Sequence, residues 1–348
     1  MKRKKMWIIV VALCVILLRC VNCVIKKASE IDFQGYEYKY MNGYSSIDYT
    51  GYHVYDGVNL AKFDQGPSFQ MLHEDEMPVL DGIEVCYPLY NTVAVNLYKN
   101  IGNIEISYLN DSVYKETNGK IVTYTNSTAG FKRLADGDID LMFGERPTLL
   151  QKEYAKKQQV SIDSFPIAKE ALVFFVNSNN PVNDLSSKQI RLIFGGKITN
   201  WKEVGGADQS ILAFQLPEES EPQRLMREFM SGDHIALMSP LTFDAPIGKA
   251  GTQKVLSKYI NAEGAIGYTY RYYLTELQQE KNVKIISVDN VYPTVDAIVN
   301  NEYPVTTYFC VSKISSNTNQ NTQRVIDFLL SNEGQTLIEK AGYCPLSK

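Results

Sequence analysis

The apolar and polar positions fall into blocks that predict strands followed by helices. One apolar strand ends at Gly82, and a helix with an apolar face begins at about Val85. A second strand at Ile121–Thr125 precedes a helix at Ala129–Ala135, and a third, buried strand ends near Phe143. Strands that alternate with helices are typical of α/β proteins with a parallel sheet, which bind ligands beyond the carboxyl ends of the strands.

The second half of the chain continues this pattern. The stretch Pro166–Gly206 contains a buried strand at Ala171–Val176, a short capped helix, a Gly-Gly bend and a loop with a tryptophan. The last helix, Gln320–Ala341, has an amphipathic spacing that docks it on a core. Further strands are expected at Ile211–Gln215, within Ala262–Tyr273, at Lys284–Val288 and at Thr306–Val311, with helices ending at about Met230 and spanning Thr294–Asn300.

Three predicted turns lead from the end of a strand directly into a helix. They lie at Asp81-Gly82, at Asn126-Ser127-Thr128 and in the loop Leu216–Arg224. The first turn of a helix has free backbone N–H groups and the positive end of the helix dipole. Each of these turns is therefore a candidate anion site.

The N-terminus has the pattern of an export signal. Four basic residues precede twelve apolar residues, from Trp7 to Leu18, which is too short a run to span a bilayer. We therefore expect residues 1–23 to be a signal, with three outcomes left open: lipidation at Cys20, an uncleaved anchor, or cleavage elsewhere. A tyrosine-rich arm without clear periodicity follows at residues 24–75, and we expect it to pack on the surface of the folded part.

Composition limits the classes of function. The 348 residues, 45% of them apolar, are enough for two domains. Five of the 35 basic residues lie in the first nineteen positions, which leaves 30 basic against 39 acidic residues. This balance argues against a nucleic-acid partner but does not exclude a small anion, whose binding depends on local dipoles. The cysteines outside the signal, Cys86, Cys310 and Cys344, are widely spaced and imply no disulfide framework.

Motifs of catalysis are missing from the sequence. The three histidines, His53, His73 and His234, are too far apart to suggest a metal cluster, and no nucleophile elbow is present. The bend at Gly195–Thr199 lacks the spacing of a phosphate-binding P-loop. We therefore expect a protein that is not an enzyme and that needs neither a metal nor a cofactor.

A set of short blocks carries a resemblance to a known family. The chain resembles the extracytoplasmic phosphate-binding proteins of bacterial ABC importers over roughly residues 52–348. The blocks that carry this likeness are Leu80–Gly82 with Tyr87–Tyr90, Asp138–Gly144, Val173–Gly206, Gly264–Tyr268, Asp327–Ser331 and Glu333–Gln335.

The resemblance implies an α/β fold of the type II periplasmic-binding-protein class. Two lobes joined by two crossing strands would close on a ligand in the cleft between them. The first lobe would comprise residues 76–167 and 286–348, and the second would comprise residues 168–285. The family also implies an exported monomer at the outer face of the cytoplasmic membrane, held there by a lipid or an uncleaved signal, that binds phosphate or a related anion and works with an ABC permease.

The resemblance also implies the ligand contacts. In the family, phosphate is held by backbone and hydroxyl groups at helix N-termini, by an arginine, and by a carboxylate that accepts the proton of the phosphate. The carboxylate matches Glu145, and the other matching positions are Gly82, Ile83, Glu84, Thr125, Ser127, Thr128 and Ser220.

Two of the three turns depart from the family pattern. Ile83 and Glu84 replace two hydroxyl residues, and Leu216 stands where the family has an arginine. Pro222 has no N–H to donate. Arg146 and Arg224 are available nearby, and we expect both to be surface residues. The alternative function is therefore a binding module with a changed or lost ligand that acts as a surface or sensory protein.

Overall fold

The computed structural model describes residues 49–216, 220–238, 263–277 and 282–347. In these ranges, seven strands form one sheet with the order β1-β2-β9-β3-β6-β5, and β7 also pairs with β3. Two short strands, β4 and β8, form a separate sheet. The strands are β1 (Leu80–Gly82), β2 (Leu141–Gly144), β3 (Ile162–Asn177), β4 (Asp184–Leu185), β5 (Leu212–Ala213), β6 (Ala265–Tyr270), β7 (Val283–Ile285), β8 (Ser287–Val288) and β9 (Thr306–Ile314).

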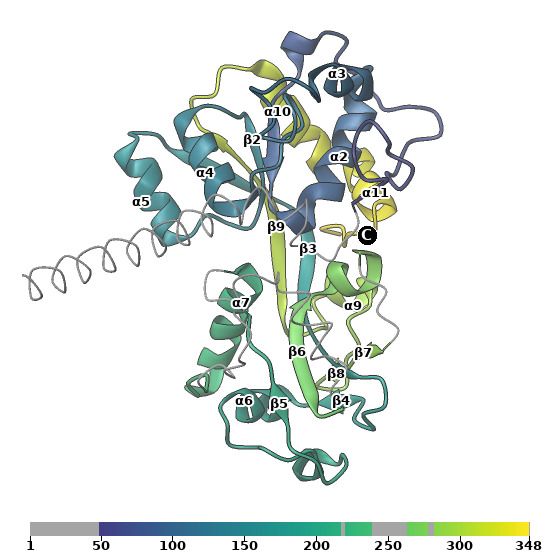
Figure 1. Cartoon of the computed structure of the whole chain (residues 1–348), viewed down its shortest axis with the longest axis vertical. Helices are drawn as coiled ribbons and strands as arrows, with labels where there is room; N and C mark the ends of the chain where they lie inside the picture. Colours follow the sequence, from purple (N-terminus) through teal and green to yellow (C-terminus); the bar gives the residue numbers. More distant parts are fainter. Residues whose placement is uncertain (1–48, 217–219, 239–262, 278–281, 348) are drawn as a thin grey trace, which may run out of the picture.

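Strand β3 joins two parts of the molecule. Residues Ile162–Ala171 of β3 pair antiparallel with β9, and Leu172–Val176 pair antiparallel with β6. The register shifts between Pro166 and Ala168, where the proline lacks an N–H for the ladder. Figure 1 shows β3 and β9 running side by side from the upper helices toward the lower ones. We call the part around β1, β2 and β9 the β2 half, and the part around β5, β6 and β7 the β6 half.

Helices cover both halves. In the β2 half, α4 packs against β1 and β2, and α2 packs against β1 on the other side (Figure 1). In the β6 half, α7 packs against β3 and β6. The helices are α2 (Tyr87–Leu97), α3 (Ile101–Tyr108), α4 (Asn126–Asp136), α5 (Leu149–Lys157), α6 (Ser187–Phe194), α7 (Glu221–Met230), α9 (Val295–Val299), α10 (Gln320–Leu330) and α11 (Asn332–Lys340), with single turns η2 (Glu74–Glu76), η3 (Glu84–Cys86), η4 (Trp201–Val204), η5 (Ser231–Asp233) and the π-helical η7 (Tyr273–Leu277).

The core of the β6 half contains the tryptophan that the sequence placed in a loop. Trp201 is fully buried, and its indole N–H donates a 3.0 Å hydrogen bond to the carbonyl of Gly264. The rings of Phe174 in β3, Phe194 in α6 and Tyr268 in β6 also pack against one another. An indole buried with its N–H satisfied fixes the loop to the start of β6.

Two sequence predictions need correction. The last helix is not continuous from Gln320 to Ala341, because Ser331 is extended and separates α10 from α11. The Ser331 hydroxyl accepts the Gly334 N–H and so caps α11. The strand expected at Ile121–Thr125 forms only one bridge, between Val122 and Leu80.

The described part of the tyrosine-rich arm packs on the β2 half. Tyr49 is buried with its ring edge-on to Tyr87, and His53 Nδ1 lies 2.6 Å from the Tyr87 hydroxyl. The signal segment, Cys20 and the start of the arm lie outside the described residues. In the residues that the structure does describe, none of the helices has both the length and the hydropathy that crossing a membrane requires.

The division into two lobes remains a prediction, and the strand pairing favours a later position for the boundary at residue 286. Strand β8 pairs in parallel with β4, so that Ser287–Val288 lie beside Asp184–Leu185. Helix α9 packs against β3. We therefore propose that the chain returns to the first lobe at the start of β9, later than the boundary at residue 286.

Candidate functional site

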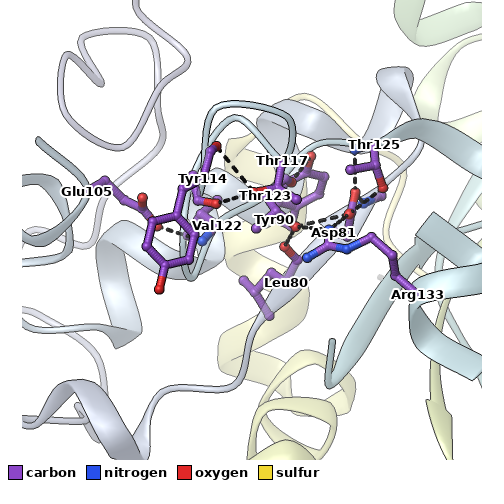
Figure 2. A network of polar contacts seen from close by, with 12 residues as sticks. Leu80, Asp81, Tyr90, Glu105, Tyr114, Thr117, Val122, Thr123, Thr125 and Arg133 are labelled. Carbon is purple, nitrogen blue, oxygen red and sulfur yellow. Dashed lines mark hydrogen bonds and ion pairs between the residues drawn. The ribbon is translucent and has the colours of Figure 1, made fainter. Parts of the chain in front are cut away.

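A buried aspartate organises the ends of the first strand and the turn before α4. Asp81, at the middle of β1, is fully buried and accepts the backbone N–H groups of Gly82 at 2.8 Å and Thr125 at 2.9 Å. The Thr123 and Thr125 hydroxyls donate to its other oxygen at 2.9 Å and 2.7 Å, and Arg133 forms an ion pair with it (Figure 2). The Thr125 hydroxyl therefore donates its proton to Asp81.

The first predicted turn is tightly packed. A Cβ on Gly82 would lie 2.7 Å from the carbonyl oxygen of Phe143, so glycine is needed for this close approach. The Ile83 N–H donates to the same carbonyl at 2.8 Å, and the Ile83 side chain is buried. Glu84 is also buried, and its Oε2 accepts a 3.0 Å hydrogen bond from the Tyr273 hydroxyl. Glu84 therefore reaches from the β2 half to η7, which follows β6.

The second predicted turn begins α4 and faces the start of α7. The Ser127 N–H donates to the Asn126 side chain at 2.8 Å, and the Ser127 side chain partly offsets the rise in pKa that burial gives the Glu221 carboxyl. Glu221 is the first residue of α7 in the β6 half. Thr128, the next residue on α4, is exposed.

Glu145 makes a second contact between the halves. It follows directly after β2, and its side chain is only 5% exposed. Its Oε2 forms an ion pair with Arg224 of α7, which also pairs with Glu228 at 2.5 Å. Burial raises the pKa of the Glu145 carboxyl well above its usual value, and the charges of Glu221 and Glu228 add to this rise.

Arg224 was expected at the surface, and the structure instead places it half-buried against Glu145. The sequence predicted Arg224 in the loop before the helix, whereas in the structure it is the fourth residue of α7. Arg146 is exposed, and its guanidinium lies 5.8 Å from the centre of the Tyr308 ring.

The start of α7 is a poor donor of hydrogen bonds. Ser220 is the N-cap, Glu221 is the first helical residue and Pro222 is the second. Pro222 has no backbone N–H to give. Burial raises the pKa of Glu221 as well.

Taken together, two loops of the β2 half contact residues of the β6 half, and the third loop faces it. The contacts pair Glu84 with Tyr273 and Glu145 with Arg224, and Ser127 faces Glu221. Of the other predicted residues, Ile83 and Thr125 are buried, Thr125 is bonded to Asp81, and Thr128 points to solvent. That any of these residues contacts a ligand stays a prediction.

The region between the halves carries several ionisable side chains. They are the carboxylates of Glu84, Glu145, Glu221 and Glu228 and the guanidinium of Arg224. Across the described ranges, no three His, Cys, Asp or Glu side chains come together in a way that could hold a metal ion. The region thus offers charge and hydrogen bonds.

A further buried carboxylate, Glu170, lies on β3 next to the point where the pairing of this strand changes from β9 to β6. Burial raises the pKa of Glu170 to about 7, and the positive charge of Arg271 opposes this rise. Arg271 follows β6 and donates a 2.5 Å hydrogen bond to the Gly342 carbonyl. The adjacent cysteine, Cys344, is buried and free, as are Cys86 and Cys310.

Comparison with known proteins identifies similar chains. A model of the PBP superfamily domain matches residues 88–333. The protein SphX of Synechococcus elongatus is 25% identical over 289 residues, which cover 76% of each chain. The phosphate-binding protein PstS of Bacillus subtilis is 25% identical over 222 residues, which cover 64% of this chain and 69% of PstS.

Solved structures with the same architecture are also found. A structure described as a phosphate ABC transporter substrate-binding protein with bound phosphate, from Clostridium perfringens, aligns with a TM-score of 0.55 and 23% identity, covering 77% of this chain and 98% of that one. An ABC-type phosphate transport receptor from Vibrio cholerae aligns with a TM-score of 0.52 and 24% identity, covering 76% and 98%. The predicted fold of the type II periplasmic-binding-protein class is thereby confirmed.

Proposed function

The chain belongs to the PBP superfamily, and on this premise we propose that it is the extracytoplasmic solute-binding protein of an ABC importer, which captures phosphate or a related small anion by closing its two lobes. The observation that carries this proposal is the pair of contacts between the halves, at Glu84 and at Glu145. Both start from loops at the ends of strands or the starts of helices, where α/β proteins bind ligands.

The choice of an anion as the ligand rests on Glu145 and on the start of α4. A carboxylate beside an anion is tolerable when the anion carries a proton to donate, as phosphate does at neutral pH and sulfate does not. The Glu145 carboxylate is buried, and Arg224 supplies a positive charge next to it. The relatives named above as phosphate-binding proteins support the same ligand class.

Titration calorimetry of the full chain with inorganic phosphate and with sulfate tests this proposal. We expect saturable heat with phosphate and weaker binding of sulfate. Glu145→Gln should reduce the preference for phosphate, because an amide does not accept the proton in the same way. Glu153→Gln, an exposed substitution on α5, is the matched control and should leave both anions unchanged. Equal phosphate and sulfate affinities in both variants and the parent would refute the role of Glu145.

A second candidate function has a specific observation in its favour. Glu84 and Glu221 place carboxylates at two turns where the family resemblance implies hydrogen-bond donors. Negative charges at these two turns would repel an anion and favour a neutral or cationic solute, or no ligand at all. The two candidates separate in the titration above, because a flat trace with phosphate up to millimolar concentration excludes the first.

The wider setting follows from the same proposal. A permease in the membrane would receive the solute from the closed form, and the protein would act as a monomer outside the cytoplasmic membrane. Attachment would come from a lipid at Cys20 or from an uncleaved signal. Mass spectrometry of the membrane-extracted protein distinguishes these, because lipidation removes the residues before Cys20 and adds the mass of the acyl groups.

A further inference from the structure

The residues directly after β6 are bound to the end of the chain, which belongs to the β2 half. The side chain of Arg271 donates a 2.5 Å hydrogen bond to the carbonyl of Gly342, in the segment after α11. The Tyr272 hydroxyl donates to the carbonyl of Ala341 in the same segment at 3.1 Å. The ring of Tyr272 also stacks on that of Tyr343, with 3.8 Å between the ring centres and 14° between the planes. The start of η7 is therefore attached to the β2 half by several contacts.

These contacts continue into the turn after β1 and close a ring. The Tyr343 hydroxyl donates to the backbone carbonyl of Val85 at 2.8 Å, and Val85 directly follows Glu84 in η3. The Tyr273 hydroxyl, next to Tyr272, donates to Glu84 Oε2 at 3.0 Å. The ring thus runs from η3 to the segment after α11, from there to η7, and back to η3.

The links of this ring differ in how easily they can be released. Tyr272 and Tyr343 are each only 1% exposed, so separating their stacked rings would bring buried apolar surface into water. Tyr273 is half-buried, and its bond ends on a carboxylate. If the halves separated here, water could replace each partner of that bond, and the carboxylate would gain hydration. The bond between Tyr273 and Glu84 is therefore the link that opens at the least cost.

We propose that this ring is a clamp that keeps the two halves closed without ligand, and that Tyr273 is its releasable residue and a determinant of solute affinity. Tyr273 is a positioning residue, because it acts through Glu84 on the separation of the halves. The effect on affinity rests on the proposed function, since it requires that the closed form holds the solute. Apparent affinity is then proportional to the share of unliganded molecules that are closed.

Three substitutions isolate this bond. Tyr273→Phe removes only the hydroxyl and keeps the ring, which stacks on that of Tyr270. Glu84→Gln removes the charge but keeps an oxygen that accepts from Tyr273. Tyr292→Phe makes the same change as the first at a tyrosine that is 50% exposed and is the matched control. Small-angle X-ray scattering of the full chain measures the radius of gyration, and calorimetry with inorganic phosphate measures affinity.

Without ligand, we expect Tyr273→Phe to have a larger radius of gyration than the parent, and saturating phosphate should return it to the radius of the parent. The radius of the parent should change little when phosphate is added. Phosphate binding by Tyr273→Phe should be weaker by about three- to tenfold, which is the order of one hydrogen bond. Glu84→Gln and Tyr292→Phe should keep the radius of the parent. If Tyr273→Phe fails to fold by circular dichroism, Glu84→Ala breaks the same bond from the other side and carries the test.

The outcomes separate this inference from the proposed function. An unliganded Tyr273→Phe chain with the radius of the parent overturns the clamp, and the phosphate titration of the parent then decides the proposed function alone. If Tyr273→Phe expands but neither it nor the parent binds phosphate, the clamp is supported and the phosphate function fails. Equal expansion of Glu84→Gln would show that the carboxylate charge, and not this hydrogen bond, holds the halves, which would overturn the role of Tyr273.

Discussion

Replacing Asp81 with asparagine tests the network that holds the end of β1 to the start of α4. The carboxylate accepts from two backbone N–H groups and two hydroxyls and forms an ion pair with Arg133 (Figure 2). Asparagine has one acceptor oxygen, and its NH₂ group would face donors. It would also leave the guanidinium of Arg133, whose side chain is 19% exposed, without its counter-charge.

The expected loss follows from these contacts. Removing one partner of a buried ion pair costs roughly 3 to 5 kcal/mol, because the other charge stays buried. Each donor left without an acceptor adds about 1 to 3 kcal/mol, although relaxation and water entry recover part of this cost. We therefore expect Asp81→Asn to lower the free energy of unfolding by about 3 to 5 kcal/mol.

Urea unfolding followed by far-ultraviolet circular dichroism measures this loss. The exposed substitution Asp138→Asn, in the turn after α4, is the matched control and should change stability by about 0.5 kcal/mol or less. Combining Asp81→Asn with Arg133→Met gives a double-mutant cycle, and the double variant should lose less than the sum of the two single losses. Strict additivity, or an Asp81→Asn loss no larger than that of the control, would refute the reasoning.

Three further predictions concern buried positions. The pKa of Glu170 is raised to about 7 from an ordinary value of 4.5, so the folded state holds this proton more tightly than the unfolded state does. The free energy of unfolding should therefore fall by on the order of 3 kcal/mol as the pH rises from 5 to 8. Urea unfolding of Glu170→Gln should lack this fall, and a pH profile equal to that of the parent would contradict the prediction. Gly82→Ala should cost about 1 to 3 kcal/mol in the same assay, since its Cβ would lie 2.7 Å from the Phe143 carbonyl oxygen, and a neutral result would mean that β1 and β2 can separate there. Lys169→Met should lower the melting temperature, because Lys169 Nζ donates to the Val299 carbonyl at 2.6 Å and to Asn301 Oδ1 at 2.8 Å, and the buried carbonyl of Val299 would lose its donor. An equal or higher melting temperature would show that burying the charge costs more than its hydrogen bonds contribute.

The sequence correctly predicted those elements whose burial depends on their own local residue pattern. The apolar run Ala171–Val176 has no polar alternation, and this part of β3 is buried on both faces. The preceding residues from Ile162 are more polar, and their place in β3 depends on pairing with β9 far along the chain. The break at Ser331 was missed for a different reason. The apolar spacing continues from α10 into α11, so the pattern gave no sign of a break. The cap, a serine whose hydroxyl accepts the N–H of Gly334 three residues later, was therefore not recognised.

The sequence predicted the loops of the candidate site, but not which side chains of the two halves pair with each other. The loops follow from hydrophobic periodicity, which marks where strands end and helices begin. Which side chains meet between the halves depends on how β3 and β9 position α7 against α4, and no local pattern encodes that distance. Arg224 was therefore expected at the surface and its pairing with Glu145 was not predicted, although each is the neighbour that makes burial of the other tolerable. A glutamate at the start of a helix, such as Glu221, is likewise ordinary until the structure places it against the other half. On the proposed function, these pairs between the halves are the positions at which to look for the ligand.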